Sequence, residues 1–184
     1  MARLVRARGP FPLRRRRGEP FQALARAIVG QMLSTRAAST IHARVLAALD
    51  GPLTPAAVLR CGPDRLRGAG LSRAKAGALL DLAARVEGGA LDLRALIEAE
   101  DEAVVTALTA VRGVGEWTAH MFLMFQLGRP DVFPSRDLGV LEGLRRAYRL
   151  AARPTPREAE QRALAWAPHR SAAAWYLWRV LEEA

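Results

Sequence analysis

The residues best suited to chemistry in this chain lie between Leu108 and Asp137, where a glycine turn joins two helical segments and a single acid follows. The turn, VRGVG at residues 111–115, carries two glycines, which permit positive φ and close backbone approach. The amides that open the next helix lack intrahelical partners and lie at the positive end of its dipole. Such a turn can bind a phosphate through the main chain alone, but an ordinary helix corner closed by a glycine cap has the same sequence.

Asp137 has two interpretations at this stage. It could supply a catalytic carboxylate, or it could cap the helix expected to follow it, because aspartate is a favoured N-cap residue. The two roles are compatible.

The elements that must position these residues are almost all helices. Strand signals are nearly absent, and helical periodicity is nearly continuous. Ser34, Ser72 and Asp137 suit N-caps, and prolines 20, 55, 63 and 156 suit first turns. The pattern predicts an all-α protein with helices at residues 20–29, 34–49, 55–59, 63–67, 72–86, 91–98, 101–110, 116–127, 137–148, 155–165 and 169–183.

The charge of the chain favours a polyanionic partner such as nucleic acid. There are 28 Lys and Arg against 18 Asp and Glu, a net charge of +10, and the sequence pI is about 11.4. Seven arginines precede the first acid, Glu19, so residues 18–184 carry only +3. We therefore expect a basic N-terminal arm at residues 1–17 and a globular domain at residues 18–184.

Several classes of protein and site are excluded by composition. No window approaches eighteen uncharged apolar residues, and no apolar segment follows the basic N-terminus, so a membrane span and secretion are not expected. Cys61 is the only cysteine, which excludes an intramolecular disulfide and a four-cysteine zinc or iron–sulfur site; we expect it to be a small buried or loop residue. His42, His120 and His169 lack metal-ligand spacing.

Two further segments carry candidate DNA contacts. In RGAGLSRAK, residues 67–75, Gly70 precedes Ser72, Arg73 and Lys75, which could contact phosphates or form only a solvated face. In residues 28–38, Gly30 interrupts a helical pattern just before Gln31 and Met32. These two side chains could fill a duplex after a base leaves it, as apolar wedges do, although most methionines only fill a core.

Five blocks in order resemble those of the helix–hairpin–helix DNA glycosylases that end in a Gly/Pro-rich loop and an Asp, the HhH-GPD superfamily. They are AIVGQMLSTRAASTI, GAGLSRAKAGAL, VRGVGEWTAHMFL, DVFPSRDLGV and WAPHRSAAAWYLW, and the similarity covers about residues 20–182. The chain is most similar to the bacterial 3-methyladenine DNA glycosylase II branch. This resemblance implies an all-α, two-lobed fold with an active-site cleft between a lobe of N- and C-terminal helices and a central lobe with the hairpin at about 101–127.

The resemblance also implies roles for individual residues. Asp137 matches the catalytic aspartate, and it would stabilise the oxocarbenium-like state that forms when a base leaves the sugar, and orient the attacking water. The implied base pocket contains Trp117, Met121, Phe133, Trp166 and His169. The implied DNA contacts are the wedge residues Gln31 and Met32, the hairpin residues Arg112, Gly113, Val114, Gly115 and Thr118, and Gly70, Ser72, Arg73 and Lys75 of the second turn.

Trp117 stands where bifunctional members of the family have a strand-cleaving lysine. We therefore expect a monofunctional DNA glycosylase that flips out alkylated bases of the 3-methyladenine or 7-methylguanine type and hydrolyses them from duplex DNA, leaving an abasic site. Core packing of an amphipathic helix is the other interpretation of Trp117. Arg112 replaces the usual hairpin proline, and Met121 and His169 replace common pocket aromatics, which leaves the range of accepted bases open.

No cofactor is expected to be required, and no iron–sulfur cluster. The resemblance implies a Na⁺ or K⁺ ion at the hairpin, bound by backbone carbonyls near Ala110, Arg112 and Gly115. We expect a monomer in the bacterial cytoplasm, at the nucleoid, with damaged double-stranded DNA as its partner. Two alternatives remain: a glycosylase for another damaged or mismatched base, and a non-catalytic module that binds damaged DNA.

Overall fold

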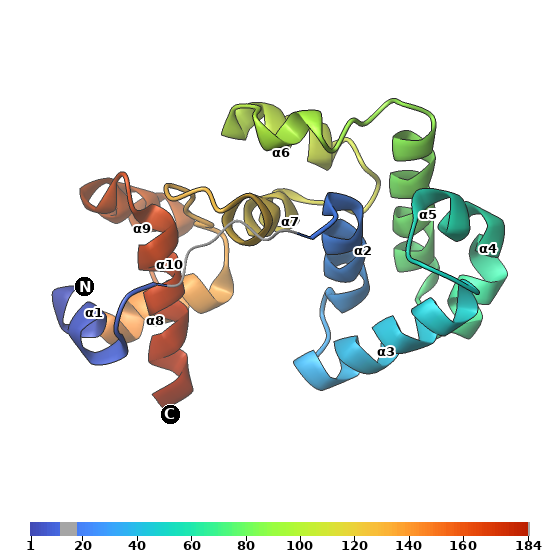
Figure 1. Ribbon diagram of the computed structural model, residues 1–184. Helices are drawn as coiled ribbons and strands as arrows, with labels where there is room; N and C mark the ends of the chain where they lie inside the picture. Colours follow the sequence, from blue (N-terminus) through green and yellow to red (C-terminus); the bar gives the residue numbers. More distant parts are fainter. Residues whose placement is uncertain (12–17, 184) are drawn as a thin grey trace. The chain divides into compact units, whose positions relative to one another are not determined.

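The computed structural model describes residues 1–11 and 18–183, and the chain forms two compact units (Figure 1). The described residues form helices and turns without a strand, as the sequence predicts. We call residues 17–122 the hairpin unit, and residues 1–16 with 123–184 the aspartate unit.

The hairpin unit is built from six α-helices around an aliphatic core. Helices α4 and α5 pack side by side, and α2 packs against both α3 and α5 (Figure 1). Its largest fully buried side chains include Leu24, Ile28, Leu66, Leu79, Leu82 and Leu108. The helices are α2 (Pro20–Gly30), α3 (Thr35–Ala48), α4 (Pro55–Gly68), α5 (Arg73–Glu87), α6 (Asp101–Thr109) and α7 (Glu116–Met121), which a π-helical turn, Phe122–Leu127, continues.

The aspartate unit contains α1 (Ala2–Arg8), α8 (Leu138–Ala147), α9 (Pro156–Ala163) and α10 (Arg170–Arg179). Short 3₁₀ turns, Leu164–Trp166 and Val180–Glu183, follow α9 and α10. Helix α10 packs against α8 and also contacts α1.

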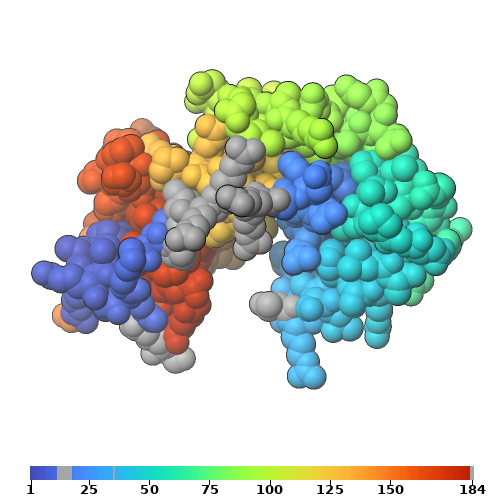
Figure 2. Space-filling view, viewed as in Figure 1, coloured from blue at the N-terminus to red at the C-terminus, as the bar shows by residue number. Residues whose placement is uncertain are grey.

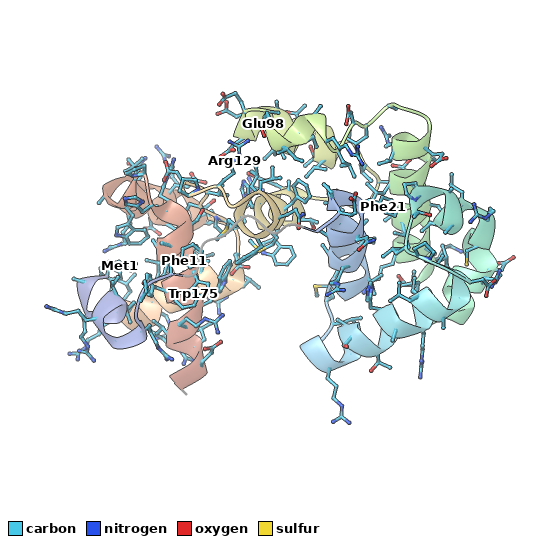
Figure 3. All side chains as sticks on the ribbon, viewed as in Figure 1. Met1, Phe11, Phe21, Glu98, Arg129 and Trp175 are labelled. Atoms are coloured by element: carbon cyan, nitrogen blue, oxygen red, sulfur yellow. The ribbon has the colours of Figure 1, made fainter. Side chains whose placement is uncertain are left out.

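Part of the expected basic arm is a helix of this unit, which the sequence analysis does not predict. The phenol of Tyr176 donates to the carbonyl of Gly9 over 2.6 Å, and Arg8 donates to the carbonyl of Arg179 over 3.1 Å. Phe11 packs against Trp175 with 5.4 Å between ring centroids (Figure 3). Figure 2 shows α1 in dark blue against the red C-terminal helices. Arg14 to Arg17, the rest of the arm's charge, lie outside the described residues.

Most predicted helix starts are confirmed by their caps. The side chains of Ser34, Ser72 and Asp137 accept the amides of Ala37, Lys75 and Val140, and α2, α4 and α9 begin with the predicted prolines. Gly62, with φ of 73°, breaks α4 between the two helices expected there.

The prediction of a helix at residues 91–98 is wrong. Only a 3₁₀ turn, Ala95–Ile97, forms there. The carboxylate of Asp92 accepts the amides of Arg94 and Ala95 at 2.9 and 3.1 Å, and this local bonding competes with an α-helix.

Cys61 and two properties of the described residues complete the account of the fold. Cys61 is buried, and its thiol lies 3.5 Å from the carbonyl of Ala48, as expected for a small core residue. Within residues 1–11 and 18–183, no three His, Cys, Asp or Glu side chains gather as metal ligands. In the same part of the chain, no helix is long and apolar enough to cross a membrane.

Candidate functional site

The hairpin turn between α6 and α7 is fixed by two buried valines and one glycine that the fold requires. Val111 and Val114 are buried, and the amide of Val114 donates to the carbonyl of Val111 over 3.0 Å. Gly113 has a φ of 74°, and a Cβ there would lie 3.0 Å from the Cβ of Ala78. Gly115 differs, because a Cβ there would meet no atom of the protein within 4 Å.

Arg112 ties the hairpin turn to α5 through its backbone. Its amide donates to the carboxylate of Asp81 over 2.8 Å, and this bond, with help from Arg85, holds the pKa of Asp81 below its usual range. A proline at this position would have no N–H to donate. The guanidinium of Arg112 lies over Gly77, whose missing Cβ would be 3.6 Å from its central carbon, and the side chain remains exposed.

The turn between α2 and α3 presents Met32 to solvent. Met32 is 100% exposed and has a φ of 55°, so it is not core filler. Gln31 points elsewhere: its side-chain amide donates to the carbonyl of Gly113 over 3.1 Å and to the hydroxyl of Thr118 over 3.4 Å. Thr118 is only 3% exposed, so its side chain, like that of Val114, lies inside the unit and offers DNA no surface.

The second glycine turn is also explained by packing within the hairpin unit. Gly70 has a φ of 104°, and a Cβ there would lie 2.6 Å from the terminal methyl of Ile41. Ser72 caps α5, and Arg73 is exposed. Lys75 is not part of a solvated face, because its ammonium donates inward to the carbonyls of Val29 and Gln31 at 2.8 and 2.6 Å.

Asp137 caps α8 and is held by a second donor that the sequence analysis missed. Its Oδ1 accepts the amide of Val140 at 2.7 Å and the indole N–H of Trp178 at 2.8 Å. Gly139 makes room for this contact, since a Cβ there would lie 2.9 Å from Cδ1 of Trp178. One turn later, a Cβ on Gly143 would lie 2.3 Å from the carbonyl oxygen of Leu177. The two glycines let α8 and α10 approach closely, and their spacing of four was a sequence signal for this.

The loop that leads to Asp137 is anchored at its start by the beginning of α10. The buried hydroxyl of Ser171 donates to the carbonyl of Arg129 over 2.7 Å and accepts the amide of Val132 over 3.0 Å. Arg170 makes two 2.7 Å bonds to the carboxylate of Asp131, and they lower the pKa of that carboxyl. In the block HRS, residues 169–171, Arg170 and Ser171 therefore anchor the loop, a role that the sequence alone did not indicate.

The expected pocket residues come from both units. In the hairpin unit, Trp117 lies on α7 with 44% of its surface exposed, so it is not a core residue, and Met121 is partly exposed. In the aspartate unit, Trp166 packs against Phe133 at 5.8 Å between centroids, and against Tyr148 at 6.4 Å. The exposed His169 starts α10 and donates its amide to the carbonyl of Trp166 over 2.7 Å. Their meeting in one pocket stays a prediction.

Comparison with known proteins decides the family. Residues 25–169 match the HhH-GPD superfamily of base excision DNA repair proteins. The chain belongs to this superfamily. The match contains the turn of Met32, the hairpin and Asp137, and it confirms the family expected from the five sequence blocks.

Relatives named as 3-methyladenine glycosylases align with most of this chain. The DNA-3-methyladenine glycosylase 1 of Schizosaccharomyces pombe is 33% identical over 165 residues, which cover 88% of this chain and 72% of that protein. A putative DNA-3-methyladenine glycosylase of Bacillus subtilis is 30% identical over 169 residues, 88% of this chain and 59% of its own length. The structure of the S. pombe 3-methyladenine DNA glycosylase in complex with abasic DNA has a TM-score of 0.86 and 31% identity, and covers 97% of this chain and 89% of that one.

Proposed function

We propose that this protein is a monofunctional DNA glycosylase that excises alkylated bases from duplex DNA in base excision repair. The observation that carries the proposal is Asp137, whose carboxylate is fixed by Val140 and Trp178 at the start of α8. The relatives named above as 3-methyladenine glycosylases support the choice of substrate class.

The first steps of the mechanism are binding and base flipping. The hairpin turn binds the DNA backbone through main-chain groups, which do not read sequence. A base cannot be reached within the stack, so the nucleotide rotates out, and Met32 occupies the vacated space. The fully exposed position of Met32 is the position that such an insertion needs.

The chemical step follows from the position of a carboxylate near the sugar. As the bond between the base and C1′ breaks, its electron pair leaves with the base and positive charge develops on the sugar. The carboxylate of Asp137 stabilises that charge. It also accepts a proton from a water molecule while the oxygen of this water bonds to C1′. The products are a free base and an abasic site.

The position of the single lysine supports hydrolysis without strand cleavage. Strand cleavage begins with an unprotonated amine that attacks the sugar, and Lys75 is the only lysine in the chain. Its ammonium is engaged by the carbonyls of Val29 and Gln31. Trp117 occupies the position that a catalytic lysine would take.

The exposed Trp117 supports a cationic purine as the substrate. A ring face attracts a positive charge by about 2 kcal/mol when the pair is desolvated. Bases of the 3-methyladenine and 7-methylguanine type carry such a charge.

The hairpin carbonyls of Ala110, Arg112 and Gly115 offer neutral oxygen ligands of the kind that bind Na⁺ or K⁺. The carbonyl of Gly115 accepts the amide of Ala119 at 3.1 Å and keeps a second lone pair. A monovalent ion there would add positive charge beside a phosphate. We also propose that the protein acts as a monomer, at the nucleoid in the cytoplasm, and needs no other cofactor.

The test is base release from methylated duplex DNA by the wild type and by Asp137→Asn. Asparagine keeps an oxygen that can accept from Val140 and Trp178, so it removes the charge and spares the cap. We expect excision to fall roughly 10²- to 10³-fold, with unchanged melting temperature and unchanged DNA affinity. Equal release by both proteins would overturn the mechanism, and cleaved strands without alkali treatment would overturn the hydrolytic outcome.

A further inference from the structure

The only lysine of this chain stands at a place that arginine would fill poorly. Of the 28 basic residues, 27 are arginines and one is Lys75, in the first turn of α5. Its ammonium bridges two carbonyls, those of Val29 and Gln31, at the end of α2. These groups belong to the carbonyls that a helix C-terminus leaves without intrahelical partners. A compact ammonium with rotatable donors fits between two carbonyl oxygens, whereas the planar guanidinium suits carboxylates and phosphates.

Gln31 is held from its side chain as well as from its backbone. Lys75 binds its carbonyl, and its side-chain amide donates to the carbonyl of Gly113 and to the hydroxyl of Thr118. One chain of contacts thus runs from α5 through Gln31 to the hairpin turn. We call the bond from Lys75 to the carbonyl of Gln31, together with the bond from the Gln31 side chain to the carbonyl of Gly113, the bracket.

Met32, the residue after Gln31, has a backbone conformation that needs such support. Its φ of 55° lies in the left-handed region, which is strained for a residue with a side chain. Its own side chain is wholly exposed and contributes no packing to offset the strain. A strained residue persists when the surrounding structure over-determines it. The bracket is next to Met32 and supplies that constraint.

We propose that Lys75 is a positioning residue that, with Gln31, locks the Met32 turn to the hairpin, so that the wedge meets DNA already in its inserting conformation. The proposal rests on the proposed function, because it concerns how the wedge acts in base flipping. It replaces the expectation that Lys75 and Gln31 contact DNA directly. Burial lowers the pKa of Lys75, which agrees with an ammonium turned toward the protein.

A direct contact between Lys75 and a phosphate is the competing explanation, and Arg73 provides the matched control. Arg73 lies in the same first turn of α5 but is exposed. Lys75→Met removes the donors and keeps most of the apolar stem, and Arg73→Met removes the charge and the donors at the exposed site. We therefore expect Lys75→Met to impair insertion of Met32 and Arg73→Met to change the salt dependence of DNA binding.

The experiment measures insertion and phosphate contact separately, with 2-aminopurine beside an abasic site in duplex DNA. Insertion of Met32 changes the fluorescence of this probe without any base removal. Lys75→Met should slow insertion roughly 10- to 100-fold and leave the salt dependence of binding to undamaged DNA unchanged. Arg73→Met should reduce the salt slope by about 0.9, one phosphate contact, and should insert as fast as the wild type once protein is added in excess to saturate the DNA. A reduced salt slope with normal insertion in Lys75→Met would overturn the proposal.

A double-mutant cycle tests whether Lys75 acts through Met32. In a Met32→Ala background, Lys75→Met should cause no further loss of insertion, because coupled residues are non-additive. Full additivity would overturn the proposal. In the free protein, amide hydrogen exchange at residues 30–34 should quicken in Lys75→Met, while exchange in α6 stays unchanged.

Gln31→Ala removes the bond from the Gln31 side chain to Gly113. This variant replaces Lys75→Met in the experiment if Lys75→Met does not fold. It should slow insertion to a similar extent, and normal insertion by this variant would count against the bracket. The readouts also separate the two proposals. A wild type that inserts Met32 under the control of Lys75 but releases no methylated base contradicts the proposed function alone. A wild type that releases bases and gives no insertion signal contradicts the bracket and the insertion of Met32, but not the excision of alkylated bases.

Discussion

The indole N–H of Trp178 donates to Oδ1 of Asp137 over 2.8 Å, although 41 residues separate them in sequence. The same oxygen accepts the amide of Val140 at the start of α8. Two donors on one oxygen fix the rotation of the carboxylate, so that it does not have to be oriented during the reaction. In a preorganised site of this kind, the cost of orientation is met when the protein folds.

Replacement of Trp178 by Phe should reduce excision and spare DNA binding. Phenylalanine keeps a ring beside Phe125, which lies 6.0 Å from Trp178 between centroids, and removes the donor to Asp137. A hydrogen bond to a charged group is worth about 1.5–3 kcal/mol, so the single-turnover rate should fall about 10- to 100-fold. The measurement is base release under enzyme excess, together with the equilibrium affinity for the same duplex.

Trp175→Phe is the matched control on the same helix. Trp175 packs against Phe11 and Tyr176, at 5.4 and 5.1 Å between centroids, whereas the indole that donates to Asp137 is that of Trp178. Its variant should excise bases at the wild-type rate. If both variants lose activity equally, the loss comes from general loosening of α10 and not from the donor to Asp137.

The two hairpin glycines should respond differently to alanine. Gly113→Ala puts a Cβ at positive φ and 3.0 Å from Ala78, and the left-handed conformation alone costs about 1–2 kcal/mol of folding stability. Gly115→Ala meets no protein atom within 4 Å and replaces only an N-cap residue. Its free energy of unfolding should change by less than about 1 kcal/mol, while its affinity for all duplexes should fall alike.

Chemical denaturation and binding to damaged and undamaged duplexes check this pair. A loss restricted to damaged DNA in Gly115→Ala would contradict the assignment of the turn to the DNA backbone. Unchanged affinity for both would mean that no phosphate approaches Gly115.

Local features of this fold were predictable from sequence, and long-range contacts were not. The caps at Ser34, Ser72 and Asp137 depend on residues within three positions, so the sequence signal for each is complete. The contacts of Trp178 with Asp137 and of Lys75 with Val29 join different helices, and their geometry depends on how those helices pack. The sequence alone therefore gives no sign that Trp178 holds Asp137, and it leaves Lys75 facing DNA or solvent. The spacing of Gly139 and Gly143 was the sequence feature that indicated close packing of α8 beside Asp137.

Asp131→Asn should destabilise the protein at neutral pH and have a smaller effect in acid. Because Arg170 lowers the pKa of Asp131 in the folded state, the pair stabilises the protein above the ordinary aspartate pKa of 3.8. This stability is lost as pH falls through the lowered value. The difference in free energy of unfolding between wild type and variant should be about 1–3 kcal/mol at pH 7 and should shrink below about pH 4.

Urea denaturation from pH 3 to 7 measures this difference. Asp64→Asn is the control, because Asp64 is exposed and lies 3.9 Å from Arg67. That variant should stay within about 0.5 kcal/mol of wild type. A pH-independent cost in Asp131→Asn would mean that the ion pair with Arg170 does not anchor the loop.

The basic N-terminal segment is best tested by substitution, because deletion would also remove a packed helix. Arg3 and Arg6 on α1 are exposed, whereas Arg8 donates to the carbonyl of Arg179. Arg3→Gln with Arg6→Gln should leave the melting temperature unchanged and reduce the salt slope of DNA binding by up to about 1.8, because each phosphate contact contributes about 0.9. Arg8→Gln should instead lower the melting temperature, since its hydrogen bond ties α1 to α10. If the double variant leaves the salt slope unchanged, α1 contributes to the fold of the aspartate unit and does not contact DNA.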